Sequence, residues 1–367
     1  MRRCVHILKH LSRTYGQKIS YMLFGVTARC DAFCRHCWNW RRVEGAGKFN
    51  KDQRKSLRDE LTVDEIKKIS SNLAPILLLN LCGGEPFIRA ELPEIVRIFR
   101  LQNDVSYFSI PTNGFATERI VSSIEIMCKE NPDAFFRIPI SFDGFGKDHD
   151  RIRSYKNGFE AAMRTAKELS RLNKKYRNFS VGAGVLFSSQ TQSNIDEFLD
   201  HLHSLDLFDM IGIMLVRGFL MDSSLKDVDM GIYQKATRKL LKYRYGARAH
   251  PFSPIHMALQ ESTFDAVARS KGSDKREFKC YAGQKFITID DIGDVFACEM
   301  LEDKKLGSLR DFDYDINELL YTDKAKEVIR FIKRKECHCT WECAINMSWI
   351  FDPLQAGPVF IKSFKYI

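Results

Sequence analysis

Residues 27–38 read Thr-Ala-Arg-Cys-Asp-Ala-Phe-Cys-Arg-His-Cys-Trp, and the interpretation of the whole chain starts from this stretch. It places Cys30, Cys34 and Cys37 on one short loop, with three residues in the first interval and two in the second. Three thiolates on one loop can bind three irons of a [4Fe–4S] cluster, which leaves the fourth iron open to a small molecule. A zinc site completed by His36, or three unrelated thiols, are the alternatives that this spacing leaves open.

The segments around this loop alternate between apolar, strand-like runs and helical stretches from residue 20 to residue 218. We expect strands at Ser20–Val26, Pro75–Leu81, Val105–Pro111, Phe135–Phe142, Phe179–Phe187 and Met210–Val216. We expect helices at Val63–Leu73, Leu92–Leu101, Thr117–Lys129, Phe159–Leu172 and Asn194–Leu205. Such alternation predicts parallel strands with right-handed crossovers, and strands without polar alternation predict cover on both faces. Six βα units predict an α/β protein built as a partial (β/α)6 TIM-like barrel.

Three further motifs lie where the second, third and fourth predicted strands end. They are Gly83-Gly84-Glu85-Pro86, Thr112-Asn113-Gly114 and Ser141-Phe142-Asp143-Gly144. Barrel active sites form at the carboxyl ends of the strands, so we expect the motifs and the cysteine loop to share one site. Glycines in such motifs allow the backbone to approach a ligand.

The cysteine loop and these motifs, in this order, resemble the radical S-adenosylmethionine (SAM) enzymes over residues 20–218. The resemblance implies a SAM-binding [4Fe–4S] cluster on Cys30, Cys34 and Cys37. It implies SAM contacts from Gly83, Gly84, Glu85, Thr112, Asn113, Ser141, Asp143, Arg153 and His36. Glu85 would pair with the SAM ammonium and Arg153 with its carboxylate through charge-assisted hydrogen bonds, while the Asp143 motif would contact the ribose.

A second group of cysteines lies near the C-terminus and comprises Cys280, Cys298, Cys337, Cys339 and Cys343. A hairpin is expected at Lys285–Ile289 and Asp294–Ala297, with Gly293 in its turn. The spacing resembles the SPASM extension of radical SAM enzymes, or its shorter relative called twitch. Five thiols suit one auxiliary [4Fe–4S] cluster, for which we expect the ligands Cys280, Cys298, Cys339 and Cys343, with Cys337 as the spare or an alternative. A structural zinc site is the other interpretation.

The resemblance also implies an activity. A reduced cluster would cleave SAM to a 5′-deoxyadenosyl radical, which abstracts hydrogen from a substrate C–H bond, with the outcome left open between oxidation, epimerisation, elimination and bond formation. Glu299, directly after Cys298, is the expected base, with a surface carboxylate as the alternative. Arg217 ends the sixth predicted strand and is expected to bind an anionic substrate group, with a SAM contact or a structural salt bridge as the alternatives.

The composition fits this interpretation. Eleven cysteines in 367 residues are an odd number in a long chain, which excludes a small secreted disulfide scaffold and favours metal or redox chemistry in a reducing cytoplasm. Cys4, Cys82 and Cys128 fall outside both groups. The net charge of +10 slightly favours an acidic substrate or carrier, and an electron donor such as flavodoxin or ferredoxin is the expected partner. No signal peptide is recognised, and residues 1–20 could form a basic amphipathic helix packed on the domain or on a membrane surface.

The expected organisation is a basic segment 1–19, the barrel 20–218, a helical connector 219–279, a cluster domain 280–345 and a tail 346–367. The 29 residues before Cys30 leave no room for the leader-binding domain of many peptide-modifying members, so a small molecule such as a sugar, aminocyclitol or lipid is the expected substrate. A maturase of a ribosomally made peptide is the alternative. An iron–sulfur or zinc protein that binds nucleic acid is a remote one, because it leaves the strand-end motifs unexplained.

Overall fold

The computed structural model describes residues 19–45, 59–243, 253–273, 276 and 278–366. Within these residues, one nine-stranded sheet has the order β6-β5-β4-β3-β2-β1-β7-β8-β9. The first six strands are β1 Tyr21–Thr27, β2 Leu78–Gly83, β3 Tyr107–Ser109, β4 Phe135–Phe142, β5 Phe179–Phe187 and β6 Met210–Leu215. Each pairs in parallel with the next one, as the alternation of segments predicts. The partial (β/α) barrel is therefore confirmed.

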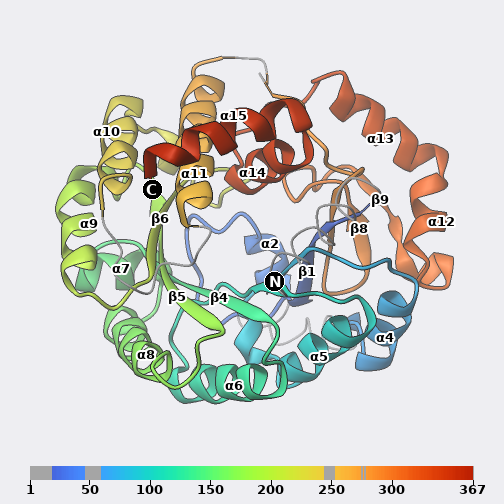
Figure 1. The fold of residues 1–367 in the computed structure, drawn as a ribbon, viewed down its shortest axis with the longest axis horizontal. Coiled ribbons are helices and arrows are strands. Elements are labelled where there is room, and N and C mark those ends of the chain that lie inside the picture. Colours follow the sequence, from blue (N-terminus) through green and yellow to red (C-terminus); the bar gives the residue numbers. More distant parts are fainter. Residues whose placement is uncertain (1–18, 46–58, 244–252, 274–275, 277, 367) are drawn as a thin grey trace.

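Amphipathic helices cover the outer face of this sheet, and Figure 1 shows them as a ring around the strands. They are α4 Val63–Ser71, α5 Leu92–Gln102, α6 Thr117–Glu130, α8 Gly158–Leu172 and α9 Ile195–Ser204. All five match expected helices to within two residues at each end. The helix α7, Gly146–Arg153, was not expected, because its sequence Gly-Lys-Asp-His-Asp-Arg-Ile-Arg has no continuous apolar face.

The two faces of the parallel strands differ in burial. On β4, Phe136, Ile138, Ile140 and Phe142 are fully buried under the helices, while the alternating residues between them stay partly accessible. The sequence predicts cover on both faces for strands that lack polar alternation, and every residue of β1 is buried as this predicts. Strand β4, which carries Arg137 and Ser141 on one face, is fully covered on the other face only. The face of β4 with Arg137 and Ser141 therefore stays partly accessible.

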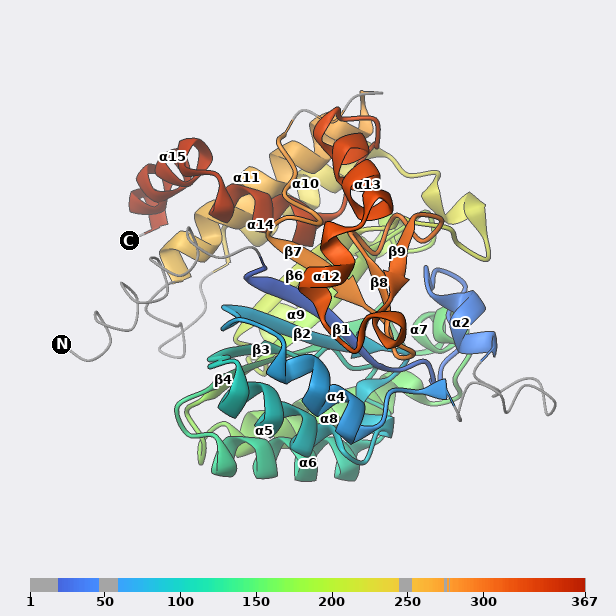
Figure 2. The same cartoon turned by 90° about the vertical axis from the view of Figure 1, so that its right-hand side faces the viewer.

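The C-terminal part of the chain continues the same sheet. Strand β7, Phe286–Ile289, pairs in parallel with β1, and the antiparallel strands β8, Asp294–Phe296, and β9, Lys305–Ser308, follow at the edge. Figure 2 shows these strands beside β1. The expected hairpin is confirmed, and Gly293 in its turn has a φ of +88°, which glycine adopts without strain. The domain boundary at residue 280 stays a prediction, since the sheet runs across it.

The remaining helices surround the open side of the sheet. They are α2 Trp40–Gly45, α10 Met230–Leu240, α11 Ser253–Lys271, α12 Ile316–Tyr321, α13 Asp323–Lys333, α14 Glu342–Phe351 and α15 Pro353–Ser363. Short 3-10 helices lie at Pro86–Ile88, Gln192–Asn194, Ser223–Lys226, Leu309–Phe312 and Phe364–Tyr366. The expected tail 346–367 instead contains most of α14 and all of α15, which pack on α11.

One expectation concerns residues that the structure does not describe. The amphipathic helix within residues 1–20, including Cys4, lies almost wholly outside the described residues, which begin at residue 19. Among the described helices, none combines the length and the apolar character that crossing a bilayer requires.

Candidate active site

The loop that carries the first three cysteines follows β1 and is held by backbone contacts. The Cys37 N–H donates to the Cys34 carbonyl at 3.0 Å, which closes a turn between the two thiols. The N–H groups of Phe33 and Arg35 donate to carbonyls at the end of α7 at 3.1 and 3.3 Å. The Cys34 side chain is buried, while those of Cys30 and Cys37 are partly accessible. The unexpected helix α7 is therefore part of the support of this loop.

The paired glycines at the end of β2 lie against the start of the cysteine loop. The Gly84 N–H donates to the Thr27 carbonyl at 2.7 Å, and the Glu85 N–H donates to the Arg29 carbonyl at 2.8 Å. A Cβ on Gly84 would lie 2.1 Å from the Arg29 carbonyl oxygen, and a Cβ on Gly83 would lie 2.1 Å from that of Thr27. Both positions must be glycine because the chain's own backbone occupies the space of a side chain.

Glu85 connects this motif to the one that follows β3. Its carboxylate accepts hydrogen bonds from the Thr112 hydroxyl at 2.8 Å and the Asn113 N–H at 2.7 Å. The Asn113 amide in turn donates to Asp31 of the cysteine loop at 2.5 Å. Burial raises the pKa of Glu85 to about 7, against the lowering effect of these donors. A SAM ammonium would stabilise the ionised carboxylate, so the expected contact is chemically sound and stays a prediction.

Asp143 and Arg153, expected to contact SAM, are paired with each other. The Arg153 Nε donates to the Asp143 carboxylate at 2.7 Å, and His36 Nε2 lies 3.7 Å from the same oxygen. Burial alone would raise the pKa of Asp143, but Arg153 and the nearby histidines lower it to about 2. Burial lowers the pKa of His36 to about 4. Three expected SAM-binding residues thus lie together beside the cysteine loop, and their roles toward SAM remain predictions.

The donor set fits the implied cofactor. Three thiols lie on one loop, next to a buried carboxylate and an arginine that match the amino and carboxylate groups of an amino acid. Burial raises the pKa of Cys37 to about 12, so ligation would have to stabilise its thiolate. Over the described ranges, no three His, Cys, Asp or Glu side chains converge closely enough to hold a single metal ion.

The C-terminal cysteines divide into two neighbourhoods. Burial raises the pKa of Cys298 well above its usual value, and the neighbouring Cys339 and Cys280 raise it further. Cys337 accepts a hydrogen bond from the buried Arg276 guanidinium at 2.8 Å, and it lies near enough to raise the pKa of Cys339 and Cys280.

Cys343 has a different environment. After burial, the groups that act on the pKa of its thiol are Arg217, Glu299, Glu342 and Arg137. These surroundings differ from those of Cys337, which we expected as the spare or an alternative ligand. The choice of ligands itself remains a prediction.

Arg217 and Glu299, the two expected substrate-side residues, are ion-paired inside the protein. The Arg217 guanidinium lies 3.5 Å from the Glu299 carboxylate and donates to Glu342 at 3.0 Å. All three side chains are nearly buried, and Glu342 also accepts the Leu215 N–H at 2.6 Å. Burial raises the pKa of Glu299 to about 7, because one arginine compensates two carboxylates. The surface-carboxylate interpretation of Glu299 is therefore wrong.

Sequence analysis missed Glu342 and Arg276. Glu342 directly precedes Cys343, just as Glu299 directly follows Cys298, so its position beside a cysteine was the available signal. Nothing local marks Arg276, because its contacts with Cys337 and the Ile332 carbonyl join segments far apart in the chain.

Comparison with known proteins supports the family assignment. Residues 25–202 match the model of the Radical SAM superfamily. The chain therefore carries a radical SAM domain, and members of that superfamily use SAM and a [4Fe–4S] cluster.

Among curated proteins, the chain is similar to the Fe-coproporphyrin III synthase of Methanosarcina barkeri, with 28% identity over 42% of this chain and 35% of that protein. It is similar to the PqqA peptide cyclase of Bradyrhizobium diazoefficiens, with 28% identity over 42% of this chain and 37% of the relative. The match thus spans little more than a third of these relatives' lengths.

Solved structures resemble the fold over most of the chain. The structure of native anSMEcpe with bound AdoMet and Cp18Cys peptide has a TM-score of 0.58 at 16% identity and covers 95% of this chain and 97% of that one. Streptococcus suis SuiB bound to the precursor peptide SuiA has a TM-score of 0.56 at 15% identity, over 89% of this chain and 70% of that one. The shared fold therefore extends past the barrel into the C-terminal part.

The glycine contact gives the first prediction. Gly84→Ala should lower the melting temperature and the iron content, because the new methyl group meets the Arg29 carbonyl and must displace the cysteine loop. Overpacking of this kind costs about 1–3 kcal/mol. Gly212→Ala is the matched control, since a Cβ there meets nothing within 4 Å. Equal melting temperatures and iron contents for the two variants would contradict this account.

The buried charges of Arg217, Glu299 and Glu342 give the second prediction. Arg217→Met should destabilise the fold by about 3–5 kcal/mol in chemical denaturation, because two buried carboxylates lose their cation. Adding Glu342→Gln to that variant should restore part of the loss, since one carboxylate is then neutral. Additive losses in the double variant would show that the pair is not coupled.

Proposed function

We propose that the chain is a radical SAM enzyme that modifies a peptide and carries one auxiliary [4Fe–4S] cluster. The radical SAM activity in this proposal rests on one observation. Cys30, Cys34 and Cys37 form a single site with the motifs at Glu85 and Asp143. When bound, the reduced cluster and SAM supply a 5′-deoxyadenosyl radical that abstracts a substrate hydrogen atom. The protein's own residues position SAM, exclude water and handle protons.

The inner face of the barrel supports a substrate site beside these residues. Ser141 on β4 is in register with Gly184 on β5, which is in register with Gly212 on β6. An added Cβ at Gly184 would lie 3.8 Å from its nearest neighbour, and at Gly212 it would meet nothing within 4 Å. This row therefore leaves room for a substrate next to the expected SAM contact Ser141.

Glu299 is our candidate for the base. Its carboxylate is buried, its pKa lies near 7, and Arg217 holds it in place. A general base whose pKa lies near the working pH accepts a proton efficiently and accelerates the reaction by about 10²–10⁴-fold. The same contacts assign Arg217 to positioning Glu299, which leaves it less free to bind an anionic substrate group.

The comparisons support a peptide as the substrate. SuiB and anSMEcpe, whose structures were solved with peptides, resemble this chain over most of its length, and PqqA peptide cyclase is a sequence relative. The small molecule expected from the sequence is the second candidate, since Fe-coproporphyrin III synthase is named for a small-molecule product. Incubation with short peptides encoded beside the gene, followed by mass spectrometry, distinguishes the two. A mass change that requires Cys34 supports the peptide, and unmodified peptides throughout would reject it.

The SAM-binding cluster is tested by Cys34→Ala. Anaerobically reconstituted protein with a strong reductant should release 5′-deoxyadenosine from SAM, and the variant should fall to background because one iron loses its ligand. Cys128→Ala, which removes a buried thiol on α6, should retain the cleavage. Cleavage by Cys34→Ala at the wild-type rate would refute the assignment.

The auxiliary cluster is tested by counting iron. The reconstituted chain should hold about eight irons, and a Cys280→Ala/Cys298→Ala variant should lose about half of them. Of the single variants, Cys337→Ala should lose auxiliary iron and Cys343→Ala should keep it, because Cys337 lies near Cys339 and Cys280. The opposite pattern would restore Cys343 as a ligand, and unchanged iron in the double variant would exclude the cluster.

A further inference from the structure

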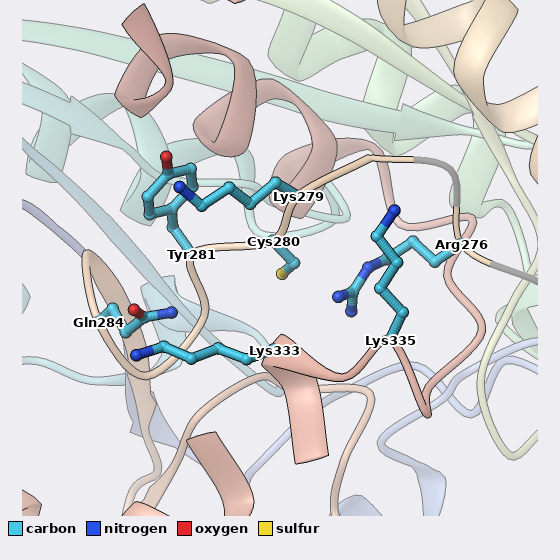
Figure 3. A pocket seen from close by; sticks show the side chains of 7 residues that line it. All are labelled: Arg276, Lys279, Cys280, Tyr281, Gln284, Lys333 and Lys335. Atoms are coloured by element: carbon cyan, nitrogen blue, oxygen red, sulfur yellow. The ribbon is translucent and has the colours of Figure 1, made fainter. Parts of the chain in front are cut away.

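A basic pocket opens beside the C-terminal cysteines. It has a volume of about 360 Å³ and is lined by Arg276, Lys279, Cys280, Tyr281, Gln284, Lys333 and Lys335. Figure 3 shows the Cys280 sulfur in the midst of these side chains, with Lys333 and Lys335 contributed by α13 and the loop after it. Cys280, one of the expected cluster ligands, thus reaches the wall of a surface pocket.

The charge of this pocket is one-sided. Four lining residues are basic and none is acidic. Lys279, Lys333 and Lys335 are exposed, and none of them forms an ion pair with an acidic group among the described residues. Lys279 instead lies 4.7 Å from the centroid of the Tyr281 ring. Three ammonium groups around one opening, of which Lys279 is also influenced by Asp352, create a positive potential that attracts an anionic partner.

Arg276 plays a different part from the lysines. It is buried, and it donates to Cys337, to the Phe278 carbonyl at 3.1 Å and to the Ile332 carbonyl. Its donors are therefore used within the chain. Through Arg276 the pocket wall also contacts a second thiol of the auxiliary group, so that two of the five C-terminal cysteines lie directly behind the lysines.

The arrangement of the three lysines suits the docking of a protein better than the binding of a small anion. A small-molecule site converges a few buried polar groups on one point, whereas these lysines are exposed and spread around the opening. Spread surface charges steer encounters between proteins, and electron-transfer complexes are small, transient and dependent on such steering. Cys280, an expected ligand of the auxiliary cluster, lies among these lysines, and a protein that carries electrons is therefore the partner that suits this surface.

We propose that the surface formed by Lys279, Lys333 and Lys335 is the docking site of an acidic one-electron carrier protein that exchanges electrons with the centre held by Cys280. The inference rests on the proposed auxiliary cluster. With a cluster bound at Cys280, the oxidised carrier would gain one electron and the cluster would lose one, without transfer of any atom. The carrier would thereby remove the electron left when a substrate radical is oxidised.

The experiment uses the full, anaerobically reconstituted chain and oxidised flavodoxin as the acidic carrier. We compare the wild type with a Lys279→Glu/Lys333→Glu/Lys335→Glu variant by isothermal titration calorimetry at low and at high salt. The control variant is Lys129→Glu/Lys167→Glu/Lys174→Glu, which makes the same charge change at exposed lysines of the barrel helices and the loop after α8. The docking variant should bind at least about tenfold more weakly at low salt, and the control within about twofold of wild type.

Several outcomes would overturn the docking site. One is that flavodoxin binding weakens equally in the docking and control variants, and another is that the docking variant binds flavodoxin with wild-type affinity. A third is that inorganic phosphate or a single-stranded oligonucleotide binds more tightly than flavodoxin and depends on the same lysines. SAM cleavage with a chemical reductant separates this proposal from the proposed function. It should remain at the wild-type rate in the docking variant, so weakened flavodoxin binding with intact cleavage supports the docking site alone. If the wild-type chain did not cleave SAM at all, the proposed function would be rejected instead.

Discussion

The close approach of two backbone segments underlies the whole site. The chain leaves β1 through Thr27 and Arg29, and it leaves β2 through Gly83 and Gly84, with no space for a side chain between the two paths. Two hydrogen bonds of 2.7 and 2.8 Å join them. The position of Cys30 relative to the Glu85 carboxylate follows from this contact, and through Glu85 so does the position of the motif after β3. Glycine is needed here for packing first, whatever ligand the loop then binds.

Charge compensation is the second feature that organises the site. Buried charges near the cysteines pair within the chain in two places, Asp143 with Arg153 and Arg217 with Glu299 and Glu342. Such groups are stable when buried only because they are paired. Burial, together with the second carboxylate Glu342, keeps the pKa of Glu299 at about 7, although Arg217 lowers it.

The continuous sheet connects the two groups of cysteines. Strand β7 adds to the sheet next to β1, so the segment that follows Cys280 pairs with the strand that precedes Cys30. Arg42 on α2, just after the cysteine loop, contacts Asp290 at 2.6 Å and Asp291 at 2.8 Å in the hairpin turn. The radical SAM domain and the C-terminal cysteines are therefore held together by main-chain pairing as well as by side chains.

The sequence by itself determined the class of fold and predicted that the cysteine loop and the strand-end motifs meet. Strand–helix alternation has a clear period, and parallel strands bring their carboxyl ends together, so motifs after successive strands had to meet. It also placed the hairpin with Gly293 at its turn. These features depend on local patterns and on rules of chain connection.

Only the tertiary structure decided how individual side chains are used. It paired Asp143 with Arg153, added Glu342 to Arg217 and Glu299, and placed Arg276 on Cys337. These contacts join residues up to 125 positions apart, as between Arg217 and Glu342, and no local periodicity in the sequence predicts them. Their choice depends on which buried charges and thiols lie within reach after packing, and packing is a property of the whole chain.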